Sequence, residues 1–376
     1  MKRAFILMHD YGGYAFPLEL SLELARRGHR LLHVYTSSSG SPTAAFPADD
    51  ANFTSVDIDI PPVRKAQFIR RWQAERAYGR KVADIIRQKK PDVLISADTP
   101  LDAQAQIARA CGQVNCEFIY WLQDILSMAT HSVLSQKFGM AGRCIGRYYH
   151  HMEKRLLRSA ASVITIAEEF AAILANWGIE DARVSVIPNW APIATIPQKS
   201  KVNSFSLEHG LADRFVVLYA GTMGMKQSPE IVVTAARALL QQQNIVFLVV
   251  SDGVGMDYLA EKKASWQLDN LILLPLQPFE RLADVLASAD AGLVLLDPDA
   301  GSFCVPSKVW SIYCSSRAAV LVVPEHNLAA RVTKNIEAGI VLSPENSQKL
   351  AETILFLQSN PEIRQRMGEN GRAYAE

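Results

Sequence analysis

Residues 214–242 read "RFVVLYAGTMGMKQSPEIVVTAARALLQQ" and place an apolar run, a turn and a helical pattern directly one after another. The aliphatic run is typical of a buried strand, and the apolar spacing after Pro229 is typical of an amphipathic helix. Gly221 and Gly224 let the backbone approach a ligand closely, and the free N–H groups of the next helix attract an anion. The segment therefore predicts a strand–turn–helix unit of a parallel sheet, with Lys226 adding positive charge at the turn.

The same alternation of short aliphatic runs and helical patterns continues along most of the chain. Such alternation favours βα units and parallel sheets. Residues 191–206, "APIATIPQKSKVNSFS", interrupt it with proline, serine and lysine, which indicates a linker. The expected strands are 4–9, 30–36, 92–97, 117–122, 162–166 and 184–187 before this segment, and 215–220, 245–250, 271–276, 291–296, 318–323 and 339–343 after it.

This pattern predicts an α/β protein of two Rossmann-like, doubly wound parallel-sheet domains. The 376 residues exceed what one hydrophobic core normally holds. We expect an N-terminal domain at 1–189, a linker at 190–210, a second domain at 211–358 and a C-terminal helix, shortened for this fold, at 359–376. Ligands of such sheets bind at the carboxyl ends of the strands, so the candidate site residues should follow strands.

Composition narrows the functional classes. A hydrophobic content of 49% with 20% charged residues is that of a globular protein, and a net charge of +1 argues against nucleic acid as a partner. No apolar run approaches the ~18 residues that cross a bilayer. The five cysteines include no CxxC pair, which fits a reducing, cytoplasmic setting.

A second anion site is expected in the segment 305–316, "VPSKVWSIYCSS". Pro306 suits the first turn of a helix, so Ser307 and Lys308 would lie at a helix N-terminus, where anions are favoured. Two positive charges, Lys226 and Lys308, are thus expected at helix N-termini of the same domain. Such a pair of charges would suit a diphosphate. The alternative is that the glycines only make a turn and both lysines are solvated.

Two further motifs are weaker. Gly253 in "VSDGVGMDYL" (250–259) predicts a tight turn beside the nucleotide, but no acidic residue follows at the spacing that a dinucleotide ribose requires. The "DPD" of residues 297–299 is similar to carboxylate motifs that hold Mg²⁺ or Mn²⁺. Because the lysines and helix N-termini already supply positive charge, we expect no metal and no cofactor.

The sequence resembles the retaining family-4 glycosyltransferases of the GT-B fold. The resemblance rests on five segments that occur in the expected order: "VITIAEEFAAILANWGIEDARVSVIPNW", "GTMGMKQ", "SDGVG", "ASADAGLVLL" and "PSK". With "WLQD" (121–124), they are most similar to the bacterial exopolysaccharide and O-antigen branch, which includes colanic-acid-type fucosyltransferases and N-acetylfucosamine transferases. The resemblance implies two domains facing across a cleft. It also implies transfer of a sugar, with retention, from a UDP- or GDP-sugar to a lipid-linked saccharide.

The resemblance also implies roles for individual residues. This sequence departs from the family pattern at Phe303 and Ser311, where many members carry glutamates that bind ribose. The implied catalytic residues are Lys226, Lys308 and Asp124. The implied donor-binding residues are Gly221, Thr222, Gly224, Gly253, Pro306 and Ser307. The implied residues near the sugar or acceptor are His9, Asp10, Gly12, Gly13 and Gln123.

Two other functions share this architecture. A nucleotide-sugar 2-epimerase would need carboxylate acid/base residues, for which Asp10 and Asp124 are the candidates. A catalytically degenerate subunit that only binds a nucleotide sugar is the third option, because the glutamate pair is absent.

Residues 64–81 contain seven lysines or arginines and one glutamate, interleaved with aromatic residues. This composition is typical of a helix on an anionic membrane, which Arg70, Arg71 and Trp72 would face. The alternative is a solvated helix with its aromatic side chains packed on the core. The first interpretation predicts a peripheral protein of the inner membrane face, where a lipid-linked acceptor would lie.

Overall fold

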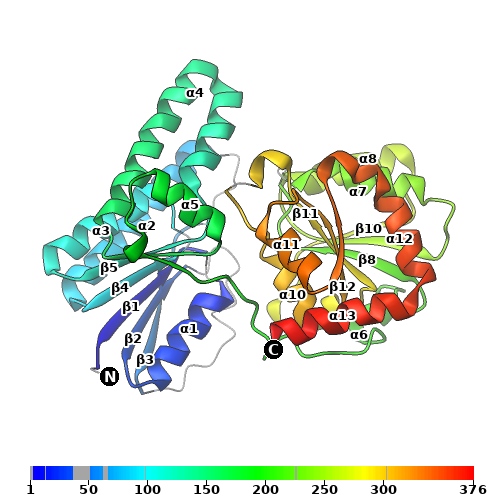
Figure 1. The fold of residues 1–376 in the computed structure, drawn as a ribbon, viewed down its shortest axis with the longest axis horizontal. Coiled ribbons are helices and arrows are strands. Elements are labelled where there is room, and N and C mark those ends of the chain that lie inside the picture. The colour runs from blue at the N-terminus through cyan, green and yellow to red at the C-terminus, as the bar shows by residue number, and fades with distance from the viewer. Residues whose placement is uncertain are drawn as a thin grey trace. The chain divides into compact units, whose positions relative to one another are not determined.

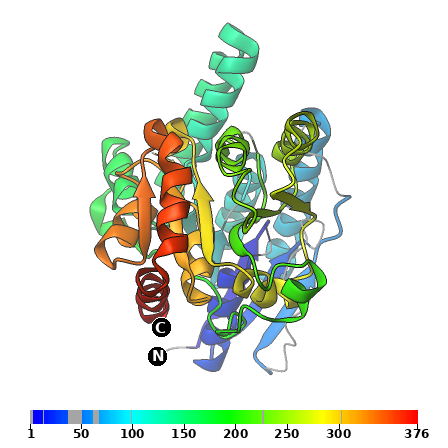
Figure 2. The ribbon, with the colours of Figure 1, turned by 90° about the vertical axis from the view of Figure 1, so that its right-hand side faces the viewer.

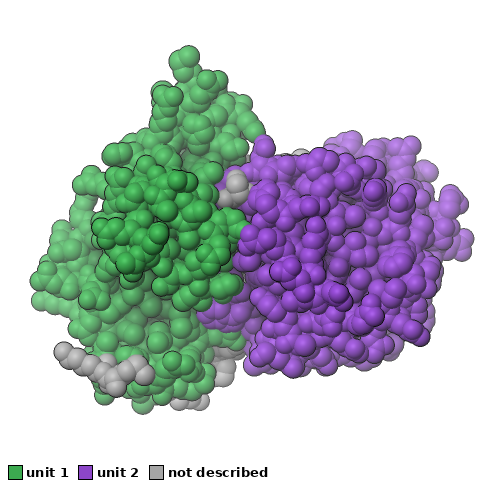
Figure 3. All heavy atoms as spheres, viewed as in Figure 1, with its two compact units in different colours: residues 1–188 green, residues 189–376 purple. Residues whose placement is uncertain are grey.

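The computed structural model describes residues 3–12, 14–36, 51–61, 67–97, 99–224, 227–301 and 303–376. The chain divides into two compact units, residues 1–188 and 189–376 (Figure 3). Each unit contains one parallel β-sheet with helices packed against it (Figures 1 and 2).

The sheet of unit 1 has the strand order β3-β2-β1-β4-β5-β6-β7, and all its pairs are parallel. The order reverses between β1 and β4, and ligands of doubly wound sheets bind beside such a reversal. The strands are β1 (Phe5–Asp10), β2 (Arg30–Tyr35), β3 (Phe53–Asp57), β4 (Val93–Ala97), β5 (Glu117–Leu122), β6 (Ser162–Thr165) and β7 (Val184–Val186). The α-helices are α1 (Ala15–Arg26), α2 (Phe68–Lys89), α3 (Leu101–Val114), α4 (Leu126–Ser159) and α5 (Glu168–Asn176).

The sheet of unit 2 has the order β10-β9-β8-β11-β12-β13 and is also parallel, with its reversal between β8 and β11. The strands are β8 (Phe215–Ala220), β9 (Ile245–Val250), β10 (Leu271–Leu274), β11 (Ala291–Leu295), β12 (Ala318–Val322) and β13 (Gly339–Leu342). The α-helices are α6 (Ser204–Glu208), α7 (Glu230–Ala238), α8 (Val254–Trp266), α9 (Leu282–Ala287), α10 (Lys308–Cys314), α11 (Leu328–Asn335), α12 (Leu350–Ser359) and α13 (Pro361–Ala375).

Strand β8 shows why this sheet is buried on both faces. Phe215, Val217 and Tyr219 belong to one core cluster, whereas Val216 and Leu218 belong to another. Successive side chains of a strand point to opposite faces, so each cluster lies on its own side of the sheet. The continuous apolar run of this strand is the sequence signature of that double burial.

All twelve expected strands are present, which confirms the predicted α/β class with two doubly wound sheets. The sequence reading missed β3. Only Phe53 of this edge strand is buried, so its sequence carries no apolar run to signal a strand.

The segment expected to be a linker at 190–210 belongs to the compact part of unit 2. Ile196 and Phe205 are fully buried in its core. The side chain of Asn203 accepts hydrogen bonds from the backbone N–H groups of Phe205 and Ser206 and so starts α6. The polar residues that suggested a linker therefore include the N-cap of a helix.

The last helix, α13, packs on α10 and β12. A Cβ added to Gly371 would lie 2.9 Å from the ring of Tyr313, so the two helices meet closely there. Arg372 donates hydrogen bonds to the carbonyl oxygens of Ile196 (3.1 Å) and Cys314 (2.7 Å). The C-terminal helix thus ties the start of unit 2 to the end of α10.

Within the described ranges, no helix is both long enough and apolar enough to span a bilayer.

Candidate functional site

Two turns of unit 2 are hydrogen-bonded to each other at the carboxyl ends of the neighbouring strands β8 and β9. Gly221 N–H donates to the carbonyl of Val250 (3.0 Å), and Met223 N–H donates to that of Asp252 (2.9 Å). Gly255 N–H in turn donates to the carbonyl of Met223 (3.0 Å). The two glycine turns therefore form one rigid edge at the place where ligands of such sheets bind.

Glycine is required in both turns. Gly221 has φ +109° and Gly253 has φ +101°, a region that residues with a Cβ avoid. A Cβ on Gly253 would also lie only 2.7 Å from the carbonyl oxygen of Met223. The sequence correctly placed tight turns here, and the structure adds that the turns pack on one another.

Lys308 reaches this edge from the start of α10. Its ammonium nitrogen lies 3.7 Å from the centre of the Tyr219 ring and donates a hydrogen bond to the Tyr219 hydroxyl. The same nitrogen would be 3.8 Å from a Cβ on Gly221. The structure thus brings Lys308 and Gly221 together, although 86 residues separate them in the sequence.

Burial controls the charge of Lys308. Removing the ammonium from water lowers the pKa of Lys308 from 10.5 to about 7, with a smaller opposing effect of Cys304. The Tyr219 hydroxyl donates to the carbonyl of Thr222 (3.0 Å), which leaves its oxygen to accept from Lys308. An incoming anion would stabilise the charged form of Lys308, so this corner is suited to a phosphate group.

The start of α10 differs slightly from the expectation. The helix begins at Lys308 with Ser307 as its N-cap, so Pro306 precedes the helix and does not lie in its first turn. Ser307 is exposed and Pro306 is buried. The carbonyl of Pro306 accepts from Val309 N–H (3.2 Å), which fixes the entry of the chain into the helix.

The rest of the first turn is held by side chains. Gln227 Oε1 accepts from Gly224 N–H at 2.7 Å, so Gly224 shapes the turn with its N–H already bonded. Ser228 has φ +44° and its hydroxyl lies 3.4 Å from Asp297 Oδ2. Lys226 lies outside the described residues.

Asp297 of the "DPD" segment acts as a local cap. Its carboxylate accepts from Asp299 N–H at 3.0 Å and starts a short 3-10 helix, Pro298–Ala300. Across the described part of the chain, no group of three or more histidine, cysteine, aspartate or glutamate side chains is arranged to hold a metal ion.

In unit 1, His9 is fully buried at the carboxyl end of β1. Its Nδ1 is 2.9 Å from the Tyr78 hydroxyl, and its Nε2 is 2.8 Å from the Thr99 hydroxyl. Burial, with a smaller effect of His33, lowers the pKa of His9 to about 3, so the ring is neutral. In this conformation His9 joins β1 to α2 and to the turn before α3, and it has no surface open to a sugar.

Asp10 is also fully buried. Its carboxylate accepts hydrogen bonds from the backbone N–H groups of Gly12 and Tyr14, directly before α1. It therefore shapes the β1–α1 turn that contains the candidate Gly12. Gly13 lies outside the described residues.

After β5, Gln123 is buried and Asp124 is partly exposed. The sequence reading missed their neighbour Glu153, whose carboxylate accepts from the backbone N–H groups of Leu126 (3.1 Å) and Ser127 (3.0 Å). Burial is the main cause that raises the pKa of Glu153 to about 7, and the charge of Asp124 adds to it. The sequence did contain a signal for Glu153, because it is a single glutamate among the basic residues of α4.

The first turn of α2 is exposed, as a membrane face requires. Trp72 is 40% exposed, and Arg70 and Arg71 are also exposed. Arg71 forms an ion pair with Glu75 at 2.7 Å, which reduces the positive charge of this face. Further along the helix, Tyr78 is buried against His9, as the alternative with aromatic side chains packed on the core requires.

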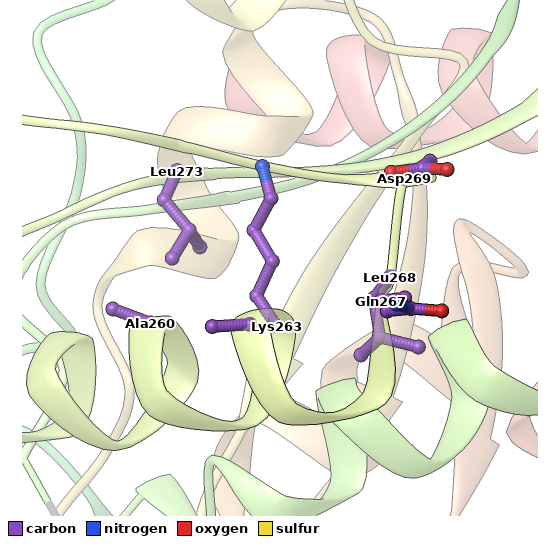
Figure 4. Close-up of a pocket in the computed structure, with 7 residues that line it drawn as sticks. Ala260, Lys263, Gln267, Leu268, Asp269 and Leu273 are labelled. Carbon is purple, nitrogen blue, oxygen red and sulfur yellow. The ribbon is translucent and has the colours of Figure 1, made fainter.

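A separate pocket lies at the end of α8 opposite to Gly253. Its lining includes Ala260, Lys263, Gln267, Leu268, Asp269 and Leu273 (Figure 4). It contains none of the candidate site residues, and we assign it no role in the reaction.

The two units match two different families. Residues 12–190 match the family "Glycosyl transferase 4-like domain", and residues 205–374 match "Glycosyl transferases group 1". Together these matches cover nearly the whole chain.

A curated relative is WcaI of Escherichia coli (strain K12), provisionally named a colanic acid biosynthesis glycosyl transferase. It is 25% identical over 206 residues, which are 54% of this chain. The match spans 50% of the length of WcaI.

Solved structures share the fold over both units. Anabaena Alr3699/HepE, solved in complex with UDP-glucose, has a TM-score of 0.72 at 16% identity, covering 98% of this chain and 94% of its own. Sucrose-phosphate synthase from Thermosynechococcus elongatus has a TM-score of 0.75 at 15% identity, covering 99% and 94%. These neighbours confirm the expected fold class, two Rossmann-like domains of the GT-B type.

Proposed function

We propose that this chain, whose two units match a 4-like domain and a group 1 domain of glycosyltransferases, transfers a sugar from a nucleoside-diphosphate sugar to a lipid-linked oligosaccharide. The donor is a UDP- or GDP-sugar, the anomeric configuration is retained, and the product belongs to bacterial surface or exopolysaccharide. The colanic acid assignment of WcaI and the UDP-glucose bound to HepE support the acceptor class and the donor class.

The observation that carries this proposal is Lys308 against Tyr219 and Gly221 at the carboxyl end of β8. When the sugar leaves, negative charge develops on the diphosphate and positive charge on the anomeric carbon. An ammonium already fixed beside the phosphate stabilises that charge without having to reorient, and it acts strongly because it is desolvated. We propose that Lys308 is the catalytic group that does this, with Lys226 adding to it.

Other residues have supporting roles in the proposal. Gly221, Thr222, Gly224 and Gly253 form the turns around the donor, and Pro306 and Ser307 fix the start of α10. Gln123 and Asp124 contact the sugar or the acceptor. His9 and Asp10 act through the β1–α1 turn with Gly12 and Gly13, because His9 and Asp10 are buried. The lysines take the part that a divalent cation would play, so transfer should proceed with EDTA present and without a cofactor.

The first turn of α2 has a place in the same proposal. A lipid-linked acceptor lies in a membrane, so we propose that Arg70, Arg71 and Trp72 face anionic lipid and keep the protein on the inner membrane surface. Flotation with anionic vesicles tests this: replacing Arg70 and Arg71 by glutamate should reduce binding, and unchanged binding would remove these residues from the membrane face.

The test of the reaction starts from a thermal-shift screen of UDP- and GDP-sugars, since a ligand that binds only the folded chain raises its melting temperature. Transfer of the selected donor to a lipid-linked acceptor is then measured for the wild type and for Lys308→Met. Loss of one such stabilising group should cost about 2–4 kcal/mol of activation energy, a rate decrease of about 30- to 1,000-fold. Lys349→Met, at an exposed lysine of the same unit, is the matched control.

Three results would contradict the proposal. These are a Lys308→Met variant with wild-type turnover, a screen in which no nucleotide sugar binds, and an acceptor-free reaction that yields an epimerised nucleotide sugar. The last result would instead identify a 2-epimerase.

A further inference from the structure

Helix α4 is a hairpin of two antiparallel arms. Gly139 has φ +55° and ψ −124°, which breaks the helix into residues 126–138 and 140–159. The hairpin projects beyond the rest of unit 1 in both views (Figures 1 and 2).

The two arms touch through their backbones. A Cβ on Gly142 would lie 1.8 Å from the carbonyl oxygen of Leu134, and one on Gly146 would lie 2.3 Å from the His131 ring. Both glycines are buried, whereas the residues around them on the second arm are exposed. Such a close approach leaves no room for large side chains between the arms, so they must point outward.

The outward side chains are unusually apolar. Met140 is 78% exposed and Tyr148 is 60% exposed, and they share a face of the second arm two turns apart. Large apolar side chains exposed on the hairpin are Val133, Phe138, Met140, Ile145 and Tyr148. A group of exposed apolar side chains on a projecting element is typical of a surface that is covered by a partner.

The charges around this apolar group have one sign. Lys137, Arg143 and Arg147 are exposed, and no aspartate or glutamate occurs from residue 125 to 152. Arg143 and Arg147 lie one turn apart on the second arm, beside the face of Met140 and Tyr148. Apolar side chains next to a cationic stripe are typical of segments that lie in the interface of an anionic bilayer.

We propose that the tip of the α4 hairpin inserts into the headgroup region of an anionic membrane, with Phe138 and Met140 among the acyl chains and the three cations on lipid phosphates. A second copy of the hairpin fits less well, because self-pairing would place these cations against one another. The inference extends the membrane face beyond α2, and it requires no assumption about the transfer reaction.

The test is flotation with vesicles of phosphatidylcholine alone or with phosphatidylglycerol, without donor or acceptor. One variant carries Phe138→Ser and Met140→Ser, and another carries Lys137→Glu, Arg143→Glu and Arg147→Glu. Since each basic residue near an anionic surface contributes about fivefold, loss of the three cations alone should lower the partition coefficient about 100-fold, and the three added glutamates should lower it further. The control carries Leu207→Ser and Phe356→Ser, two apolar side chains of unit 2 with comparable exposure, and should bind like the wild type.

A local probe makes the test specific to the hairpin. Cys144 is the exposed cysteine of the hairpin, whereas Cys111, Cys116 and Cys314 are buried. In a Cys304→Ala background, an environment-sensitive fluorophore on Cys144 should shift to the blue with phosphatidylglycerol vesicles and should be quenched by spin-labelled lipid.

The proposal is overturned if the wild type does not float with anionic vesicles, or if both hairpin variants bind like the control. It is also overturned if Arg70→Glu with Arg71→Glu abolishes binding while the hairpin variants keep it. If the hairpin variants change only the oligomeric state, measured by size-exclusion chromatography with light scattering, the occupant is a second copy and not a membrane. Because none of these measurements involves sugar transfer, their outcome is separate from that of the proposed reaction.

Discussion

Donor binding should draw a proton from solution, because the pKa of Lys308 is about 7 in the empty site. At pH 8 such a group is charged in only ~10% of molecules, whereas a bound diphosphate strongly favours the charged form. Binding at pH 8 should therefore take up about 0.9 protons per site. Isothermal titration calorimetry in buffers of different ionisation enthalpy measures this number directly, and a nucleotide sugar is the suitable ligand because its diphosphate does not itself titrate near pH 8.

The same pKa predicts how affinity and stability depend on pH. Donor affinity should be constant below pH 7 and fall about tenfold per pH unit above it, as the empty site loses its charge. The unfolded chain keeps the Lys308 proton up to pH 10.5, so between pH 7 and 10.5 it binds more protons than the folded chain. This group therefore makes the free energy of unfolding rise with pH across that range, and Lys308→Met should lack the rise.

The control is Lys349→Met, which should keep both the proton uptake and the pH profile of the wild type. Uptake close to zero in the wild type, or a donor affinity independent of pH from 7 to 9, would refute the assignment of Lys308 to the phosphate.

Gly253→Ala should cost about 1–3 kcal/mol of stability and weaken donor binding, because a Cβ meets the Met223 carbonyl at a positive φ; thermal unfolding and calorimetry measure both effects, and unaltered values would show that the turn adapts. Tyr78→Phe should cost about 1–3 kcal/mol in urea unfolding, because it leaves His9 Nδ1 without its partner, yet transfer by the folded protein should persist. Loss of transfer at full stability would instead place His9 in the reaction. For Glu153→Gln, the unfolding free energy relative to the wild type should increase between pH 4.5 and pH 7 and level off above pH 7, because over that range the unfolded wild type ionises Glu153 while the folded wild type keeps it protonated; a constant difference would contradict the raised pKa of about 7.

The fold could be predicted because its strands are fully buried. The run "IVFLVV" of β9 is apolar at every position and is covered on both faces. Strand β3 carries no such signal, because it lies at a sheet edge with most of its side chains in solvent. The hairpin of α4 was missed for a different reason, since its arms associate through glycines and not through a stripe of large apolar residues.

The candidate site was predictable in its location but not in its electrostatics. The sequence pattern placed Gly221 and Lys308 at the ends of strands and starts of helices, and the structure brings them together. Nothing local to Lys308 indicates that it lies on the ring of Tyr219, which lowers its exposure to water and its pKa. Likewise, His9 looks accessible after a strand until Tyr78 and Thr99, from distant segments, enclose it.

The anchoring of α10 by α13 would make this helix a control point for the proposed reaction. Arg372 holds the carbonyl of Cys314, the last residue of the short helix that begins with Lys308. Removal of the last turn of α13 would leave every proposed donor-binding residue in place and still free that short helix to shift. Loss of this turn would then slow the proposed sugar transfer before it causes the protein to unfold.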